Sequence, residues 1–310
     1  MNQPNEVSRS RVHGVLVTYR RPIDLANTLH CLANQTLQLD TLVIVDNDKS
    51  CGAKPYVEAY PSAVYIAAGN NLGPAGGLAL GISAVLLDTS ENDWILLLDD
   101  DDPPSHREQI GQLYSFAERA ASSIPAVGAV GLVGARYNYR RGRTERVKDS
   151  ELKGIVRVHS LGGGQLPMYR AKTVRSVGVP DPSLFFGFEE LEYGLRVLAA
   201  GWNIVVDGDE WRRLRAERGR EGLARRHIRT RNLVAPWRAY YGTRNQIIIA
   251  KRFGGATASV LCTLDCLARL TRAIWQSERR ATARMIAKGC VDGLLSRSGR
   301  RVDPSSPPEV

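Results

Sequence analysis

The 310-residue sequence predicts an α/β protein with a mostly parallel sheet, flanking helices and a helical C-terminal region. Short β-rich runs alternate with helical patterns in the first half of the chain, as they do where helices cover a parallel sheet. Three predicted strands end in polar residues, and in such sheets ligands bind at the carboxyl ends of strands. Beyond Pro236 the pattern is mostly helical.

The elements follow from these patterns in chain order. Strands are predicted in the first half over residues 12–18, 42–45, 64–67 and 94–98. Helices are predicted over residues 23–35, opened by Pro22, and over residues 75–87, after the glycine-rich segment NNLGPAGG. The middle of the chain predicts strands over residues 126–135, 155–158, 165–169 and 203–206, and a helix over residues 188–200 that stops at Gly201.

We therefore expect four segments along the chain. They are a flexible N-terminus at residues 1–11, an α/β domain at residues 12–250, a basic helical region at residues 251–300 and a disordered tail at residues 301–310.

The composition is that of a soluble globular protein, with 43% apolar and 24% charged residues, which excludes disorder and collagen-like repeats. No stretch reaches about 18 uninterrupted apolar residues, so neither a signal peptide nor a transmembrane helix is expected. The five cysteines are scattered without a CxxC pair, which indicates neither a disulfide framework nor a zinc site and favours a reducing, cytoplasmic setting.

The net charge of +10 is concentrated in the C-terminal half. Residues 212–231 contain nine Arg and two Glu, and residues 251–301 contain eleven basic and three acidic residues. Such stretches are solvated or meet an anionic partner, such as a membrane surface, a nucleotide or a nucleic acid. A nucleic-acid-binding module is thus one candidate class, although no RRM, KH or zinc-finger motif supports it.

Four consecutive aspartates, Asp99 to Asp102, directly follow the apolar run WILLL. Adjacent carboxylates repel each other, so such a strand end needs a cation or full solvation. Alternate residues of an extended segment share a face, so Asp99 and Asp101 could bind one divalent ion while Asp100 points elsewhere. A solvated acidic turn is the alternative.

Two other segments carry candidate chemistry. NNLGPAGG joins a strand to a helix, where glycines allow close approach of a ligand, although tight helix packing explains it equally well. In FFGFEELEYGLR, acidic residues follow three aromatics at the start of a helix. The helix dipole would stabilise these carboxylates, whereas apolar neighbours would raise their pKa and make a general base.

The order and spacing of these pieces resemble the family 2 glycosyltransferases, which have the GT-A fold. The resemblance covers about residues 12–250 and rests on VTYRRP, VDN, NNLGPAGG, LLLDDDD and FFGFEELEYGLR. Within that family, TYRRP, NLGPAGG, EELEYGLR and WRAYYGTRN resemble bacterial galactofuranosyltransferases, and rhamnosyltransferases share much of the same set. A nucleotidyltransferase, which also uses aspartates and a metal, would need a glycine-rich, lysine-bearing opening loop that the sequence lacks.

The resemblance implies roles for residues on the donor side. Thr18, Arg21 and Asp46 fall where the family holds the nucleotide base, and Asn71 and Gly73 lie on the loop that lines the nucleotide sugar. Asp46 at a strand end can accept a hydrogen bond from N3–H of either uracil or thymine, so this pocket does not separate UDP from dTDP sugars.

The resemblance also implies the reacting groups. Asp99 and Asp101 take the metal positions and would hold Mn²⁺ or Mg²⁺, with Asp100 beside them at the nucleotide sugar. Glu190 falls at the catalytic base of an inverting displacement, and Glu189 would bind the acceptor. The family's third metal ligand is a His, for which we expect His227 beyond an arginine-rich insertion, and a surface His in a basic stretch is the alternative.

The expected reaction is transfer of galactofuranose from UDP-galactofuranose to a polyprenyl-diphosphate-linked glycan in cell-wall polysaccharide synthesis, at the inner face of the membrane. Transfer from dTDP-rhamnose is the alternative, and no nucleic acid partner is expected. Apolar residues recur at near-helical spacing among arginines in the C-terminal region, and they predict either a membrane-facing surface or core packing. They are Val260, Leu261, Leu264, Leu267, Leu270, Ile274 and Trp275.

Overall fold

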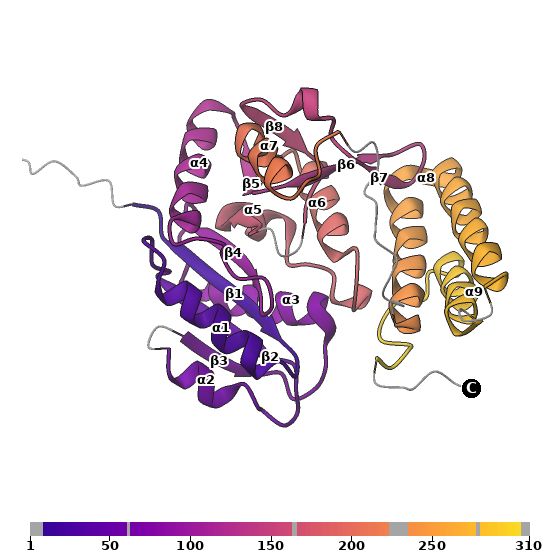
Figure 1. Cartoon of the computed structure of the whole chain (residues 1–310), viewed down its shortest axis with the longest axis horizontal. Helices are drawn as coiled ribbons and strands as arrows, with labels where there is room; N and C mark the ends of the chain where they lie inside the picture. The colour runs from indigo at the N-terminus through magenta and orange to yellow at the C-terminus, as the bar shows by residue number, and fades with distance from the viewer. Residues whose placement is uncertain (1–8, 61–62, 163–165, 223–234, 277–279, 305–310) are drawn as a thin grey trace, which may run out of the picture.

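The computed structural model describes residues 9–60, 63–162, 166–222, 235–276 and 280–304 (Figure 1). The first strands are β1 (Val12–Thr18), β2 (Thr41–Asp46), β3 (Ala63–Ala67), β4 (Trp94–Asp99), β5 (Val127–Gly131) and β6 (Gly134–Asn138). The later strands are β7 (Arg143–Glu145), β8 (Ile155–Val158), β9 (Ser160–Leu161), β10 (Met168–Arg170) and β11 (Asn203–Asp207). The helices are α1 (Pro22–Ala33), α2 (Lys54–Glu58), α3 (Gly73–Val85), α4 (Gln109–Ser123), α5 (Ala171–Val177), α6 (Glu189–Ala199), α7 (Gly208–Glu217), α8 (Pro236–Ile274) and α9 (Arg280–Leu294).

Eight strands form the central sheet, in the order β3-β2-β1-β4-β10-β5-β11-β8. β3, β2, β1 and β4 are parallel to one another, as are β5 and β11, whereas β10 and β8 run antiparallel to their neighbours. A small sheet, β7-β6-β9, stands beside it. The prediction of a mostly parallel sheet with flanking helices and a helical C-terminal region is therefore confirmed.

Side chains alternate between the two faces of the sheet, which creates two cores. On β1, Leu16 packs in one core with α1 and α4, through residues such as Leu25 and Ile110. Its neighbour Val15 packs in the other core, with α3 and α6 through Ile82 and Tyr193. Strands buried on both faces explain why WILLL and TLVIV read as uninterrupted apolar runs.

One predicted element needs correction, and several helices were not predicted, α4 and α5 among them. The predicted strand 126–135 is two strands, because the chain leaves the central sheet after Gly131 and Gly134 pairs with Leu161 of β9. Helix α4 was not predicted, although its buried residues Ile110, Leu113, Phe116, Ala117 and Ala120 have helical spacing. Helix α5 was also not predicted, since its seven residues offer too short a pattern.

Helix α8 is not one straight rod. Gly255 has a φ of 72°, and the helical segments on its two sides pack against each other and against α9. By length and composition alone α8 could cross a membrane, although no transmembrane helix was expected from the sequence. In the most apolar 18-residue stretch of α8, 28% is buried. Figure 1 shows this helical region on one side of the sheet. Three of the free cysteines meet in its core, namely Cys262, Cys266 and Cys290.

Both ends of the described chain are anchored beyond the expected domain limits. The backbone N–H of Arg11 donates to Asp93 at 3.0 Å, inside the segment expected to be flexible. At the other end, the hydroxyl of Tyr241 donates to the carbonyl of Val302 at 2.7 Å. Residues 1–8 and 305–310 lie outside the described residues.

Candidate active site

Polar residues at three neighbouring strand ends meet at the carboxyl edge of the central sheet. Thr18 of β1 pairs in register with Asp46 of β2, and Val17 pairs with Asp99 of β4. Thr18 and Asp46 are buried, whereas Asp99 is exposed. The convergence expected from the sequence is therefore present, and it places the predicted donor residues beside the aspartate run.

Asp100 points away from Asp99 and into a network of donors. Its carboxylate accepts a hydrogen bond from Thr18 Oγ1 at 2.8 Å and from Arg21 Nη1 at 3.2 Å. Its carbonyl accepts from Thr28 Oγ1 at 2.8 Å. Arg21 also pairs with Asp101. Desolvation opposes charge on Arg21, but the two aspartates prevail and raise its pKa, so the guanidinium is a fixed positive charge at this edge.

Asp46 is fully buried and is held by three donors. Its Oδ1 accepts from the backbone N–H of Asp48 at 2.9 Å, and its Oδ2 accepts from Ala53 N at 3.2 Å and from Tyr65 Oη at 2.9 Å. Each carboxylate oxygen can accept two hydrogen bonds. Oδ1 therefore has one donor among the described residues, and Oδ2 has two.

Asp99 has no ion-pair or hydrogen-bond partner for its carboxylate among the described residues. Desolvation by the surrounding protein and the nearby negative charge of Glu190, followed by the other aspartates of the run, raise the pKa of Asp99 to about 7. The structure thus brings Glu190 of α6 close to the end of β4, about 90 residues away in the sequence.

Glu189 and Glu190 begin α6 in different surroundings. Glu189 is 5% exposed, and its Oε2 has no hydrogen-bond partner in the described structure. Burial, Glu190 and Asp99 together hold the pKa of Glu189 well above its ordinary value. Glu190 is half-buried, and burial raises its pKa as well. Glu190 is therefore the more accessible of two glutamates whose pKa is raised, a property that suits a general base.

The loop before these glutamates has an unusual backbone. Phe185, Gly187 and Phe188 have φ values of 61°, 77° and 68°, in the left-handed region that non-glycine residues rarely occupy. Fixed contacts must maintain this geometry. Asn245 supplies them, because its Nδ2 lies within hydrogen-bond distance of the carbonyls of Leu184, Phe186 and Gly187, at 3.0, 3.0 and 2.7 Å.

Asn245 and its neighbour Arg244 explain the motif WRAYYGTRN. Both side chains are fully buried on α8, and Arg244 donates to the carbonyl of Leu184 at 2.7 Å. The motif contributed to the resemblance, but no role was predicted for these two residues. An adjacent Arg and Asn inside an apolar helical pattern was the available signal, because buried polar groups need partners.

The loop with Asn71 and Gly73 packs against the loop of residues 185–188, called the strained loop below because of its left-handed backbone. Asn71 Oδ1 accepts from the N–H of Gly73 at 2.9 Å, and Asn47 Nδ2 donates to the Gly73 carbonyl at 3.1 Å. Gly73 has a φ of 69°, and a Cβ there would collide with the carbonyl oxygen of Phe185. Glycine is thus required at this position by backbone contact, and the loop lies directly beside the segment that carries Glu190.

The aspartate run fits a divalent cation in charge. Asp99 is exposed and unpaired, and it sits among carboxylates whose repulsion a cation would offset. Asp101 is also exposed but is paired with Arg21. No group of three or more His, Cys, Asp or Glu side chains is arranged for a metal within the described ranges. One or two carboxylates suffice where substrate phosphates and water complete the coordination, as is usual for Mg²⁺. His227 lies outside the described residues.

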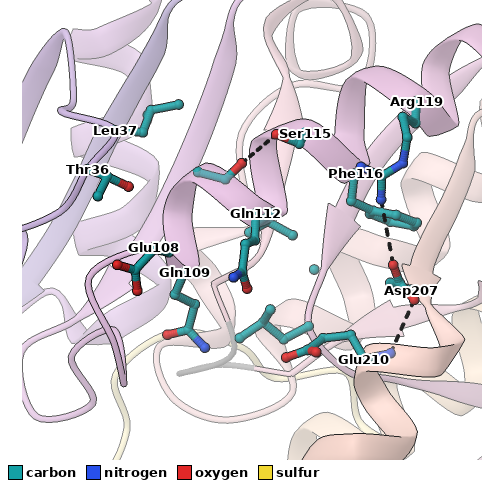
Figure 2. Close-up of a pocket in the computed structure, with 14 residues that line it drawn as sticks. Thr36, Leu37, Glu108, Gln109, Gln112, Ser115, Phe116, Arg119, Asp207 and Glu210 are labelled. Carbon is teal, nitrogen blue, oxygen red and sulfur yellow. Dashed lines mark hydrogen bonds and ion pairs between the residues drawn. The ribbon is translucent and has the colours of Figure 1, made fainter.

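A cavity of about 590 Å³ lies elsewhere in the domain (Figure 2). Gln112, Phe116 and Arg119 of α4 line it together with Asp207 and Glu210, and Arg119 pairs with Asp207 at 3.8 Å. Phe116 belongs to the core of the opposite sheet face from α6. None of the predicted catalytic or donor residues that the structure describes lines this cavity.

Helix α7 contains the first part of the arginine-rich stretch, and several of its arginines are paired within the protein. Arg213 pairs with Glu210 and Glu217, and Arg215 pairs with Asp149. The excess of positive charge near residues 212–231 is therefore partly used in internal ion pairs.

Comparison with known proteins agrees with this geometry. The family model described as glycosyl transferase family 2 matches residues 15–173, about half of the chain, and this segment contains the second half of β1, β2 to β4 and the aspartate run. The chain belongs to the family 2 glycosyltransferases and is a transferase. This result displaces the nucleic-acid-binding module as the class of the protein.

Two curated relatives are galactofuranosyltransferases named GlfT1. The protein from Mycobacterium tuberculosis (strain ATCC 25618 / H37Rv) is 36% identical over 203 residues, and the one from Mycolicibacterium smegmatis is 33% identical over 203 residues. The matches span 61% of this chain and just under two thirds of the relatives, 65% and 66%. The chain is therefore similar to galactofuranosyltransferases over part of their length.

The fold is also shared with a solved structure. The crystal structure of S. aureus TarS matches with a TM-score of 0.52 and 13% sequence identity, and the match covers 93% of this chain and 49% of that one. At this identity the likeness concerns the fold alone, and it agrees with the GT-A fold expected from the sequence.

Proposed function

We propose that this glycosyltransferase moves galactofuranose from UDP-galactofuranose to a glycan on a polyprenyl-diphosphate carrier, with inversion at the anomeric carbon. Similarity to GlfT1 over 203 residues supports the choice of donor. The observation that carries the chemistry is the approach of Glu190 to Asp99, which brings a candidate base to the edge that holds the predicted donor residues.

In the proposed reaction, Glu190 removes the proton from an acceptor hydroxyl as the oxygen attacks the anomeric carbon, and the nucleoside diphosphate leaves. Thr18, Arg21 and Asp46 hold the nucleotide, and Arg21 also neutralises Asp100 and Asp101. Asp99 and Asp101 would hold Mn²⁺ or Mg²⁺, which when bound would stabilise charge on the departing diphosphate.

A donor panel tests the proposal. Purified protein is incubated with UDP-galactofuranose, UDP-galactopyranose or dTDP-rhamnose in the presence of manganese, and release of UDP or dTDP is measured. We expect turnover only with UDP-galactofuranose, and loss of turnover in the Glu190→Gln variant. Turnover with dTDP-rhamnose alone would replace the donor and leave the catalytic assignment standing.

We also propose that the C-terminal helices rest on an anionic membrane, at the inner face of the cell membrane where a lipid-linked acceptor is presented. Six of the seven apolar residues singled out in the sequence are exposed, and only Leu270 is half-buried. Exposed Arg269 and Arg272 lie among them. An apolar strip with interspersed arginines combines burial in lipid with attraction to anionic headgroups.

Vesicle sedimentation tests this second proposal. The wild-type protein should pellet with anionic vesicles and much less with neutral ones, and Leu264→Asp with Leu267→Asp should reduce pelleting. Leu87 is 90% exposed and lies outside the strip, so Leu87→Asp is the matched control. Equal and negligible pelleting with both kinds of vesicle would overturn the membrane proposal and return the strip to another role.

A further inference from the structure

The segment after α9 returns to the candidate active site and places one arginine on it. Gly299 N donates to the carbonyl of Ser183 at 2.6 Å, and Arg244 Nη1 donates to the carbonyl of Gly299 at 2.5 Å. Val302 exchanges two hydrogen bonds with the hydroxyl of Tyr241, at 2.7 and 3.2 Å. The backbone is thus fixed on both sides of Arg300. Figure 1 shows this segment, in yellow, running from α9 past the N-terminal end of α8.

Arg300 reaches from this segment to both loops of the site. Its Nη1 donates to the carbonyl of Asn71 at 3.2 Å and lies 3.5 Å from Asn70 Oδ1. Its guanidinium also lies over the ring of Phe185, 5.7 Å from the ring centroid. Asn71 belongs to the predicted donor loop, and Phe185 belongs to the strained loop before Glu190. The arginine therefore spans the seam between the two loops.

The seam, where the Asn70–Asn71 loop meets the strained loop, is held mainly by van der Waals contact rather than by hydrogen bonds. One main-chain bond, from Ala75 N to the carbonyl of Phe185, crosses it at 3.4 Å, near the upper limit for such a bond. Gly73 packs directly against the same carbonyl. A displaced Asn70–Asn71 loop would no longer present the groups that would hold a donor sugar at Asn71. A donor that binds must then also order the loop, which lowers its affinity.

We propose that Arg300 is a positioning residue for glycosyl transfer, which fixes the Asn70–Asn71 loop against the loop of Phe185 and so sets the donor site. The inference rests on the proposed function, because it takes Asn71 to line the nucleotide sugar. It assigns the helical C-terminal region a part in donor binding, through a residue about 230 positions away from the loop it holds. No substrate contact is required of Arg300 itself.

Arg301 offers a matched control in the neighbouring position. It has the same charge and is similarly accessible, but its Nε pairs with Asp292 at 3.4 Å, on the α9 side of the segment. Arg300→Ala and Arg301→Ala therefore remove the same group from the same segment, one with the loop contact and one without it. Arg300→Lys keeps the charge but lacks the planar fork that reaches Asn70 and Asn71 while covering Phe185.

The experiment compares steady-state kinetics of the full-length variants with UDP-galactofuranose, with thermal unfolding measured in parallel. We expect Arg300→Ala to raise the donor KM about tenfold, the effect of losing one charged hydrogen bond, with a small change in kcat. Arg300→Lys should recover part of the loss, and Arg301→Ala should keep the wild-type KM. The two alanine variants should unfold at similar temperatures, which a merely structural role for Arg300 would not give together with the KM change.

Hydrogen exchange of the backbone amides gives a second, activity-independent measurement. Arg300→Ala should accelerate exchange in residues 70–76 relative to Arg301→Ala, because the loop loses its external anchor. Equal donor KM in the wild type and both alanine variants would overturn the inference while the proposed function stands. Absence of sugar transfer by the wild type from every donor would overturn the proposed function and with it the role of Arg300 in donor binding, whereas the exchange result would still decide whether Arg300 holds the loop.

Discussion

Asp99 and Asp100 are adjacent in the sequence, but their carboxylates belong to two regions that differ in the hydrogen-bond donors supplied by the protein. In the compensated region, the buried carboxylates Asp46 and Asp100 accept hydrogen bonds from hydroxyls, backbone N–H groups and Arg21. In the uncompensated region, burial raises the pKa of Asp99, Glu189 and Glu190. The negative charge of Glu190 raises the pKa of Asp99 and Glu189 further. None of the described Lys, Arg or His side chains forms an ion pair with these three.

The difference indicates what each region is for. A carboxylate whose donors come from the protein itself is a structural and positioning group, and its removal costs stability. Carboxylates left together without a cation destabilise the fold, and such arrangements are concentrated at functional sites. We therefore expect substitutions in the uncompensated region to lower activity with little loss of stability, and those in the compensated region to lower stability together with donor binding.

The largest effect is expected at Glu190. Glu190→Gln keeps the shape of the side chain but cannot accept the proton, so transfer should fall by about 10²- to 10⁴-fold while donor binding survives. Glu189→Gln is the comparison and should lower transfer less, because Glu189 is buried with a raised pKa and a neutral amide resembles its protonated form. Equal losses of donor affinity and rate in Glu190→Gln would assign it a structural role instead.

A loss of about 10²-fold in rate is expected for Asp99→Asn, together with loss of manganese binding, since a metal ion supplies several kcal/mol of transition-state stabilisation. Asp101→Asn should act in the same direction. Asp102→Asn is the control within the same run of aspartates. Manganese titrations of activity report the result, and wild-type turnover of the Asp99 and Asp101 variants in EDTA would contradict the metal assignment.

For Asp46→Ala in the compensated region we expect a loss of stability in addition to weaker donor binding. Removing this carboxylate leaves the buried N–H of Ala53 and the half-buried hydroxyl of Tyr65 without their acceptor, and the free energy of unfolding should fall by about 3 kcal/mol. Asp48→Ala, at a half-buried neighbour that pairs with Ser50 and exposed Arg20, should change it less. Urea unfolding monitored by circular dichroism distinguishes them, and equal stability of the two variants would remove the distinction between the regions.

A smaller effect is expected from pH on the metal-free protein. Because the pKa of Asp99 is raised from its ordinary value of 3.8 to about 7 in the folded state, its ionisation destabilises the fold increasingly as pH rises from about 4 to 7, and the penalty is constant above 7. Asp99→Asn cannot ionise, so it should unfold at a higher temperature than the wild type at pH 8 and by a clearly smaller margin at pH 5. Thermal unfolding in EDTA at the two pH values tests the sign.

The smallest expected effect concerns His227, which stays a prediction from the sequence. His227→Ala should raise the manganese concentration needed for half-maximal activity. An unchanged metal titration would leave His227 as a surface residue of a basic stretch.

Much of the α/β architecture could be predicted from the amino-acid sequence. Apolar runs that end in Thr18, Asp46 and Asp99 predicted both the strands and their common edge, because parallel strands covered by helices bury both faces and meet ligands at their carboxyl ends. The resemblance of the motifs to family 2 glycosyltransferases is borne out by the family match. These signals are local or periodic, so they can be recognised without knowledge of long-range contacts.

The partners of the site carboxylates and the residues that anchor the site loops depend on contacts between distant segments. Which aspartate of the run is paired depends on Thr18 and Arg21 from a distant strand end, and which glutamate is accessible depends on burial at the start of α6. The anchoring of the Phe185 loop by Asn245, and the reach of Arg300 to Asn71, join segments 60 to 230 residues apart. Spacing along a chain carries no information about such contacts, because packing of whole elements brings these residues together.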